Sequence, residues 1–178
     1  MTIRELTAAD LGRIVEIDRS EHVTKKYVYD HGTLRAIAVD IEAPRWSPAY
    51  GARETERLAQ KLDGGGVFLG AFDDERLVGV GVLAGHFIGH SANQLEVAFL
   101  HVSNGHRGRG IARRLLDELA ERARRRGAEQ LYISATETES AVGFYLAYGC
   151  ELAERVDPEL YALEPTDIHF TFALEPRP

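Results

Sequence analysis

The chain has 178 residues, 44% of them hydrophobic and 28% charged, so we expect one soluble globular domain over residues 1–178. A net charge of −7 disfavours nucleic acid as a partner. The single cysteine excludes a disulfide within the chain, and the histidines lack the close spacing of metal ligands, so a metal site is not expected. Because no apolar run approaches the roughly 20 residues that span a bilayer, and the first residues lack a secretory signal pattern, we expect a cytoplasmic protein with no membrane partner.

The first segments indicate a strand, a short helix and a stretch of mixed character. Residues 2–6 are typical of a short strand. Thr7 and Asp10 have the spacing of a capping box, which favours a helix directly after that strand. Residues 22–46 have strand-like content around a glycine turn, but their pattern leaves a helix in this stretch open.

A helix and a three-stranded antiparallel meander follow. Ser47 before Pro48 is typical of a helix start, and the glycines at 64–66 end that helix. Asp73 and Asp74 suit a hairpin turn between the first two strands of the meander. The three strands are expected at residues 67–72, 76–87 and 94–103.

Beyond the meander the hydrophobic period becomes helical. We expect an amphipathic helix over residues 110–126, a buried strand over 129–135 and a second helix over 136–149. Thr136 and Glu139 are the expected capping pair of the second helix. Two closing strands are expected at residues 150–156 and 167–174. This order of elements predicts an α/β fold, in which a mixed sheet carries helices on both faces.

A glycine-rich loop joins the last meander strand to the amphipathic helix. Gly105, Gly108 and Gly110 let backbone N–H groups approach an anion closely, and the start of the helix adds a partial positive charge. Arg107 and Arg109 can supply charge-assisted contacts to phosphate. The Walker and dinucleotide-binding fingerprints are both absent. The loop therefore predicts a pyrophosphate-bearing ligand of another kind.

Residues 107–112, Arg-Gly-Arg-Gly-Ile-Ala, resemble the acetyl-CoA signature of the GCN5-related N-acetyltransferases (GNAT), which reads Arg/Gln-x-x-Gly-x-Gly/Ala. An apolar residue, Val102, stands five positions before the arginine, as it does in that family. Other matching residues are Ile3, Arg4, Leu6 and Asp10 near the start and Ala141, Phe144, Tyr145 and Gly149 after the signature. The resemblance covers nearly the whole chain and implies the GNAT fold, with a mostly antiparallel central sheet and helices on both faces.

The same resemblance implies the ligand and the chemistry. Acetyl-CoA is the expected co-substrate, no metal is needed, and the acetyl group passes directly to an amine. A backbone N–H near the end of the third meander strand is expected to bind the oxyanion, and Tyr145 is expected to protonate the CoA sulfur. Thr138 departs from the asparagine that is frequent in the family. The expected cofactor contacts are Leu100, His101, Val102, Arg107, Gly108, Arg109, Gly110, Ile111, Ala112, Thr138, Ala141 and Tyr145.

Glu96 is the candidate catalytic base, because it stands eleven residues before Arg107, like the glutamate base of the histone-acetyltransferase branch. On an evenly alternating strand, Glu96 shares one side with Leu100 and Val102, whereas His101 lies on the other side. An apolar neighbourhood on that side could raise the pKa of a carboxyl group. Two alternatives stay open: Glu96 is an exposed or ion-paired strand carboxylate, or ordered water is the base.

The sequence leaves the acceptor amine open, and a small-molecule amine is the default expectation. A homodimer is compatible with the resemblance, since dimers are common in the family. A rival interpretation is a non-catalytic acyl-CoA-binding sensor or partner-binding module on the same fold. The residues expected on the acceptor side are Glu21, Asp30, Asp40, Glu42, Trp46, Glu164 and Asp167.

Overall fold

The structure, a computed structural model, describes residues 1–174 and is built around one seven-stranded sheet. In order across the sheet, the strands are β1 (Thr2–Glu5), β4 (Val67–Asp73), β5 (Arg76–Ile88), β6 (Gln94–Val102), β7 (Gln130–Ala135), β9 (Ile168–Ala173) and β8 (Glu151–Leu152). Neighbouring strands are antiparallel except for β6 and β7, which run parallel. The expected mixed, mostly antiparallel sheet is confirmed, including the meander β4–β5–β6.

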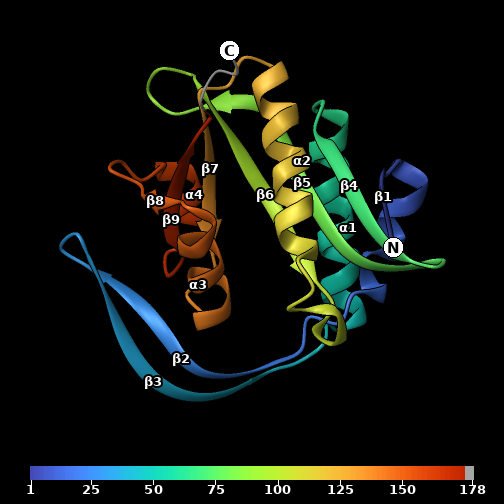
Figure 1. Cartoon of the computed structure of the whole chain (residues 1–178), viewed down its shortest axis with the longest axis horizontal. Helices are drawn as coiled ribbons and strands as arrows, with labels where there is room; N and C mark the ends of the chain where they lie inside the picture. The colour runs from blue at the N-terminus through green and yellow to red at the C-terminus, as the bar shows by residue number, and fades with distance from the viewer. Residues whose placement is uncertain (175–178) are drawn as a thin grey trace.

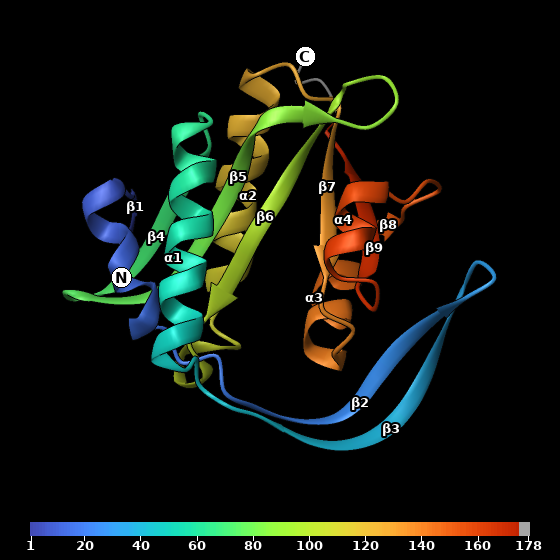
Figure 2. The ribbon, with the colours of Figure 1, turned by 180° about the vertical axis from the view of Figure 1, so that it is seen from behind.

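Helices cover both faces of the sheet, as expected (Figures 1 and 2). Helix α1 (Pro48–Asp63) lies in front of the sheet in Figure 2, and α2 (Ile111–Arg125) lies in front of it in Figure 1. The remaining helical segments are η1 (Ala8–Glu16), η2 (Asn104–His106), α3 (Glu139–Tyr148) and α4 (Pro158–Leu163). The predicted helix after Thr7 is therefore present, but its turns are of the 3-10 type.

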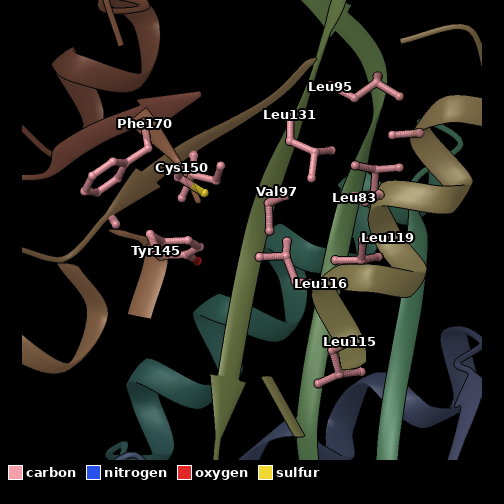
Figure 3. Close-up of a cluster of buried hydrophobic side chains, with 14 of the residues drawn as sticks. Leu83, Leu95, Val97, Leu115, Leu116, Leu119, Leu131, Tyr145, Cys150 and Phe170 are labelled. Carbon is pink, nitrogen blue, oxygen red and sulfur yellow. The ribbon is translucent and has the colours of Figure 1, made fainter. Parts of the chain in front are cut away.

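Two clusters of buried side chains hold these helices to the sheet. On one face Leu116 and Leu119 of α2 pack in a cluster with Val97 of β6 (Figure 3). On the other face Leu58 of α1 belongs to a cluster with Phe99 of β6. Each fully buried leucine contributes about 2 kcal/mol, so these apolar faces decide which side of each helix meets the sheet.

Local signals set most helix ends, with one correction. The Ser47 hydroxyl accepts a hydrogen bond from the Tyr50 backbone N–H at 3.2 Å, so the predicted start of α1 is confirmed. The predicted cap of α3 at Thr136 is wrong, because Thr138 occupies the N-cap position. The Thr138 hydroxyl accepts a hydrogen bond from the Ala141 backbone N–H at 3.4 Å, and the helix begins at Glu139.

The end of the chain differs from the expectation of two long closing strands. The first shrinks to the two residues of β8, and α4 follows it. The Asp157 carboxylate caps α4 by accepting from the backbone N–H groups of Glu159 at 3.0 Å and Leu160 at 3.1 Å. Asp157 before Pro158 is the same type of signal as Ser47 before Pro48, so this helix was within reach of sequence reasoning.

The stretch that sequence left open is a separate two-stranded sheet of β2 (Glu21–Asp30) and β3 (Thr33–Ala43). Its turn residues His31 and Gly32 have φ of 45° and 87°, which suits a two-residue hairpin turn. The hairpin extends away from the main sheet (Figure 1). It is tied to the start of α3, because the Tyr27 backbone N–H donates to the Glu137 carbonyl at 2.7 Å and Lys25 pairs with Glu139 at 2.5 Å.

Candidate active site

Strands β6 and β7 pair over a short stretch and then separate (Figure 2). The paired residues are Gln94 with Gln130, Leu95 with Leu131 and Glu96 with Tyr132. Within the described residues, the edge of β6 that faces β7 has no strand partner from Val97 to Val102. We call this region, Val97–Val102 on one side and Ile133–Ala135 on the other, the strand parting. An unpaired strand edge offers a row of backbone N–H and C=O groups to an extended ligand.

The predicted ligand residues Leu100, His101 and Val102 lie on this edge, and the glycine loop follows directly. Gly108 and Gly110 have φ of 74° and 76°, which favours glycine. A Cβ at either position meets nothing within 4 Å, so the requirement is conformational rather than one of space.

The first turn of α2 is open at its N-terminus. Gly110 is the N-cap residue and has no side chain to cap the helix. The backbone N–H groups of Ile111 and Ala112 begin this turn, where the helix dipole is positive. This geometry suits an anion, as the sequence predicts for Gly108, Arg109 and the residues after them.

Arg107 uses its side chain inside the protein. Its guanidinium donates to the carbonyls of Val102 at 3.2 Å and Arg19 at 3.3 Å, and to the Glu21 carboxylate at 2.9 Å. These bonds tie the glycine loop to the end of β6 and the start of β2. A phosphate contact by Arg107 is therefore left to its backbone, while the side chain of Arg109 is exposed.

Tyr145 lies on α3 with its side chain buried beside the strand parting. Its ring packs 5.1 Å from the ring of Phe144 and 5.8 Å from that of Phe170. Figure 3 shows the hydroxyl turned towards β6. Burial raises the pKa of Tyr145, and the nearby Cys150 and Asp167 add to the rise. The side chain is therefore a neutral phenol at physiological pH and retains a proton to donate.

Glu96 is buried and ion-paired. Only 6% of the residue is exposed, and its carboxylate accepts from the Lys61 ammonium of α1 at 2.8 Å. The sequence left open whether Glu96 is exposed or ion-paired, and in the structure Glu96 is ion-paired. Its negative charge is matched by a lysine that the sequence gave no reason to place beside it.

The expected alternation along β6 is wrong, because the strand contains a β-bulge. Phe99 pairs with Val82 and Val97 with Leu83, so Ala98 is an extra residue without its own partner. A bulge of this kind reverses which face later side chains point to. His101 consequently lies on the same face as Glu96, towards α1, and not opposite to it.

His101 is enclosed by aromatic rings on that face. Its ring lies 5.4 Å from the ring of Trp46 and 4.4 Å from that of Phe99. Burial lowers its pKa to about 4, with further contributions from Arg19 and Arg107. At pH 7 it is a neutral, packed histidine.

A second carboxylate of interest is Asp167, which precedes β9. The Ser134 hydroxyl of β7 donates to it at 2.9 Å. Burial raises the pKa of Asp167 to about 6 against this hydrogen bond, and Glu164 and Glu137 add to the rise. From sequence, Asp167 is expected on the acceptor side only as one acidic residue among several. Its contact with Ser134 depends on the pairing of β7 with β9, which no local signal reveals.

The predicted contacts at Thr138 and Ala141 lie together at the start of α3, near the hairpin. The Thr138 hydroxyl caps the helix, and the Thr138 backbone forms an isolated β-bridge with Lys26 of β2. Residues 1–174 hold no group of His, Cys, Asp and Glu side chains that could bind a metal ion. In the same part of the chain, no helix is both long and apolar enough to cross a membrane.

Comparison with known proteins finds a matching family model. The family model described as "Acetyltransferase (GNAT) family" matches residues 31–149, which include the glycine loop and Tyr145. No curated protein matches the chain.

Several solved structures have the same fold at low sequence identity. Nourseothricin acetyltransferase is 24% identical, with 98% of each chain covered and a TM-score of 0.73. A putative streptothricin acetyltransferase from Bacillus anthracis str. Ames, in complex with acetyl coenzyme A, is 19% identical, with 98% of this chain and 97% of that one covered and a TM-score of 0.66. PaiA N-acetyltransferase from Thermoplasma acidophilum, in complex with coenzyme A, is 20% identical, with 97% of this chain and 98% of that one covered and a TM-score of 0.64.

Proposed function

The chain belongs to the GNAT family of acetyltransferases, and we propose that it transfers the acetyl group of acetyl-CoA to a small-molecule amine at the strand parting. As a member of this family it is an acyltransferase that uses acetyl-CoA as its co-substrate. The observation that carries the proposed site is the continuity of two binding features. The unpaired edge of β6 leads directly into the open N-terminus of α2, within the residues that carry the family signature.

We place the pyrophosphate of acetyl-CoA at the backbone of residues 108–112 and the extended pantetheine arm along the edge of β6. The amine attacks the thioester carbonyl, and a backbone N–H near Leu100–Val102 binds the oxyanion. Tyr145 donates its proton to the departing CoA thiolate. With that proton the sulfur departs as a neutral thiol, which is the main form at pH 7 because a thiol has a pKa of about 8.5.

The net charge of −7 supports a cationic amine, and not nucleic acid, as the partner. A small-molecule acceptor is also supported by structural neighbours of similar length, among them nourseothricin acetyltransferase and aminoglycoside 6′-acetyltransferase type Ii. We further propose a cytoplasmic location, where acetyl-CoA is at hand, and a homodimer remains our expectation from the family.

The binding site is tested by calorimetry with acetyl-CoA, ATP and NAD. We expect micromolar affinity for acetyl-CoA alone. In Gly110→Ala the Cβ strains a backbone at φ 76°, so we expect affinity to fall about tenfold. Gly105→Ala is the matched control, because Gly105 lies in the same loop without a positive φ and a Cβ there meets nothing within 4 Å. Equal affinity of both variants and the parent would contradict the proposed phosphate site.

The acid role of Tyr145 is tested by Tyr145→Phe. We expect kcat to fall about 100-fold while the affinity for acetyl-CoA is kept, because the ring still packs and only the proton is lost. Tyr148→Phe on the same helix is the control, since its hydroxyl donates to Asp117 at 2.8 Å and is not assigned to the reaction. Unchanged turnover in Tyr145→Phe would remove the acid assignment.

A further inference from the structure

We propose that Asp167 is the base that takes the proton from the acceptor ammonium. The inference rests on the proposed acetyl transfer and assigns a step that the reaction requires. An alkyl ammonium with a pKa of about 10 cannot attack the thioester until it loses a proton.

Glu96, the base expected from sequence, already has a structural partner. Its carboxylate is bound to the Lys61 ammonium at 2.8 Å, and the residue is 6% exposed. Separating a buried pair is costly, because it leaves the other charge uncompensated. The Glu96 carboxylate is thus occupied by the lysine, whereas an acceptor ammonium needs a carboxylate that no cation of the protein already pairs.

Asp167 is held differently. The Ser134 hydroxyl donates to its Oδ2 at 2.9 Å, and among the described residues no lysine or arginine forms an ion pair with it. The charged groups that act on it are the carboxylates Glu164 and Glu137, and Glu137 lies 3.6 Å from the Lys26 ammonium. One hydrogen-bond donor orients Asp167 without neutralising it, so a cationic amine can pair with it.

The alternation of side chains along β7 shows on which face of the sheet Asp167 lies. Ile133 and Ala135 of β7 face the cluster that includes α2, so Ser134 between them faces the opposite side of the sheet. Asp167 reaches Ser134 from one residue before β9, at the end of β7 where β6 has already separated. It therefore lies on the face that carries α1 and α4 (Figure 2).

Tyr145 lies on the other face of the sheet, and the charge of Asp167 acts on it. Its side chain belongs to the cluster that includes α2, and the charge of Asp167 contributes to the rise of its pKa after burial and Cys150. The acid and the base thus lie on opposite faces of the sheet at the strand parting. In the proposed arrangement the amine approaches from the α1–α4 face, where Asp167 lies, and acetyl-CoA from the α2–α3 face, where Tyr145 lies.

The reaction balances with these two groups. The ammonium gives one proton to Asp167, and the neutral amine forms a C–N bond with the thioester carbon as the C=O π pair moves to oxygen. When the oxyanion collapses, the C–S bond breaks and Tyr145 protonates the sulfur. The second nitrogen proton restores the phenol, and Asp167 releases its proton to solvent, so the products are the amide, CoA thiol and one proton.

The test is Asp167→Asn in the full chain, assayed by thiol release with acetyl-CoA and a panel of nourseothricin, an aminoglycoside and spermidine. With the amine that the parent acetylates fastest, we expect kcat to fall about 100-fold or more, while affinity for acetyl-CoA is unchanged. In the parent, kcat should rise with pH as a group with a pKa of about 6 loses its proton, and this limb should vanish in the variant.

Glu137→Gln is the charge-matched control, because it removes one negative charge close to Asp167 and leaves the base in place. It should keep kcat and shift the acidic limb to lower pH. The melting temperature of Asp167→Asn should not fall, since the variant no longer buries a charge. A lower kcat at an unchanged melting temperature then reports a loss of catalysis and not a loss of folding.

Asp167→Asn with parental kcat and an unchanged acidic limb would overturn the assignment. Failure of the proposed function is distinguishable from this result, because it shows as absence of acetyl-CoA binding by the parent protein.

Discussion

At the scale of single residues, Arg107 shows how a signature side chain can act indirectly. Its planar guanidinium joins three acceptors that belong to different segments: the end of β6, the residue Arg19, and Glu21 at the start of β2. A fork of this kind needs several donors in fixed directions, which lysine does not have. The side chain thereby fixes the loop whose backbone is proposed to bind pyrophosphate.

We therefore expect Arg107→Lys to weaken acetyl-CoA binding about tenfold, even though the charge is kept, because the loop loses its preorganised shape. Arg125→Lys is the control: Arg125 lies at the far end of α2 and pairs with Glu121 at 3.2 Å. Calorimetry of both variants measures the effect. If Arg107→Lys bound acetyl-CoA like the parent, the guanidinium network would not be what shapes the loop.

At the scale of elements, the Lys61–Glu96 pair joins α1 to β6 across the apolar face of the sheet. The side chain of Glu96 is 8% exposed and that of Lys61 is 20% exposed. We expect Lys61→Met to lower the free energy of unfolding by about 3 kcal/mol, because it leaves Glu96 buried without its partner. The double variant Lys61→Met/Glu96→Leu should regain most of that loss.

The comparison is Lys25→Met, which breaks the exposed pair with Glu139 and should cost about 1 kcal/mol or less. Urea denaturation of the three variants measures these differences. A Lys61→Met loss no larger than that of Lys25→Met would mean that water already screens the Glu96 carboxylate.

How far sequence predicted the elements depends on how local their causes are. The start of α1 and the glycine loop were predicted because Ser47 and Gly110 act on neighbours within a few residues. The sequence did not predict that Glu96 and His101 lie on the same face of the sheet, because the bulge at Ala98 exists only in the pairing of β6 with β5. The same holds for Asp167, whose partner Ser134 is 33 residues away in sequence. Tyr145 was found through its family resemblance, not through its own spacing.

At the scale of the whole molecule, two histidines whose pKa values are lowered in the fold make stability depend on pH. Burial lowers the pKa of His101 to about 4 and also lowers that of His169, so both are neutral in the folded chain. An unfolded histidine has a pKa of about 6.5, so the contribution of His101 is complete above pH 6.5 and is lost as pH falls towards 4. The contribution of His169 is lost in the same direction. His22 and Asp167, whose pKa values are raised by Glu42 and by burial respectively, act in the opposite direction.

We expect His101→Phe to separate these effects, because phenylalanine keeps the ring contacts with Trp46 and Phe99 but has no proton to gain. Between pH 7 and 5 the free energy of unfolding of the parent should fall relative to that of the variant, by about 2 kcal/mol at pH 5. His90→Phe is the control for the substitution itself, since His90 is exposed. Urea denaturation at pH 5, 6 and 7 measures all three proteins. Parallel curves for His101→Phe and the parent would mean that His101 accepts a proton in the folded chain, and the packing of β6 against α1 would then tolerate a charge between its rings.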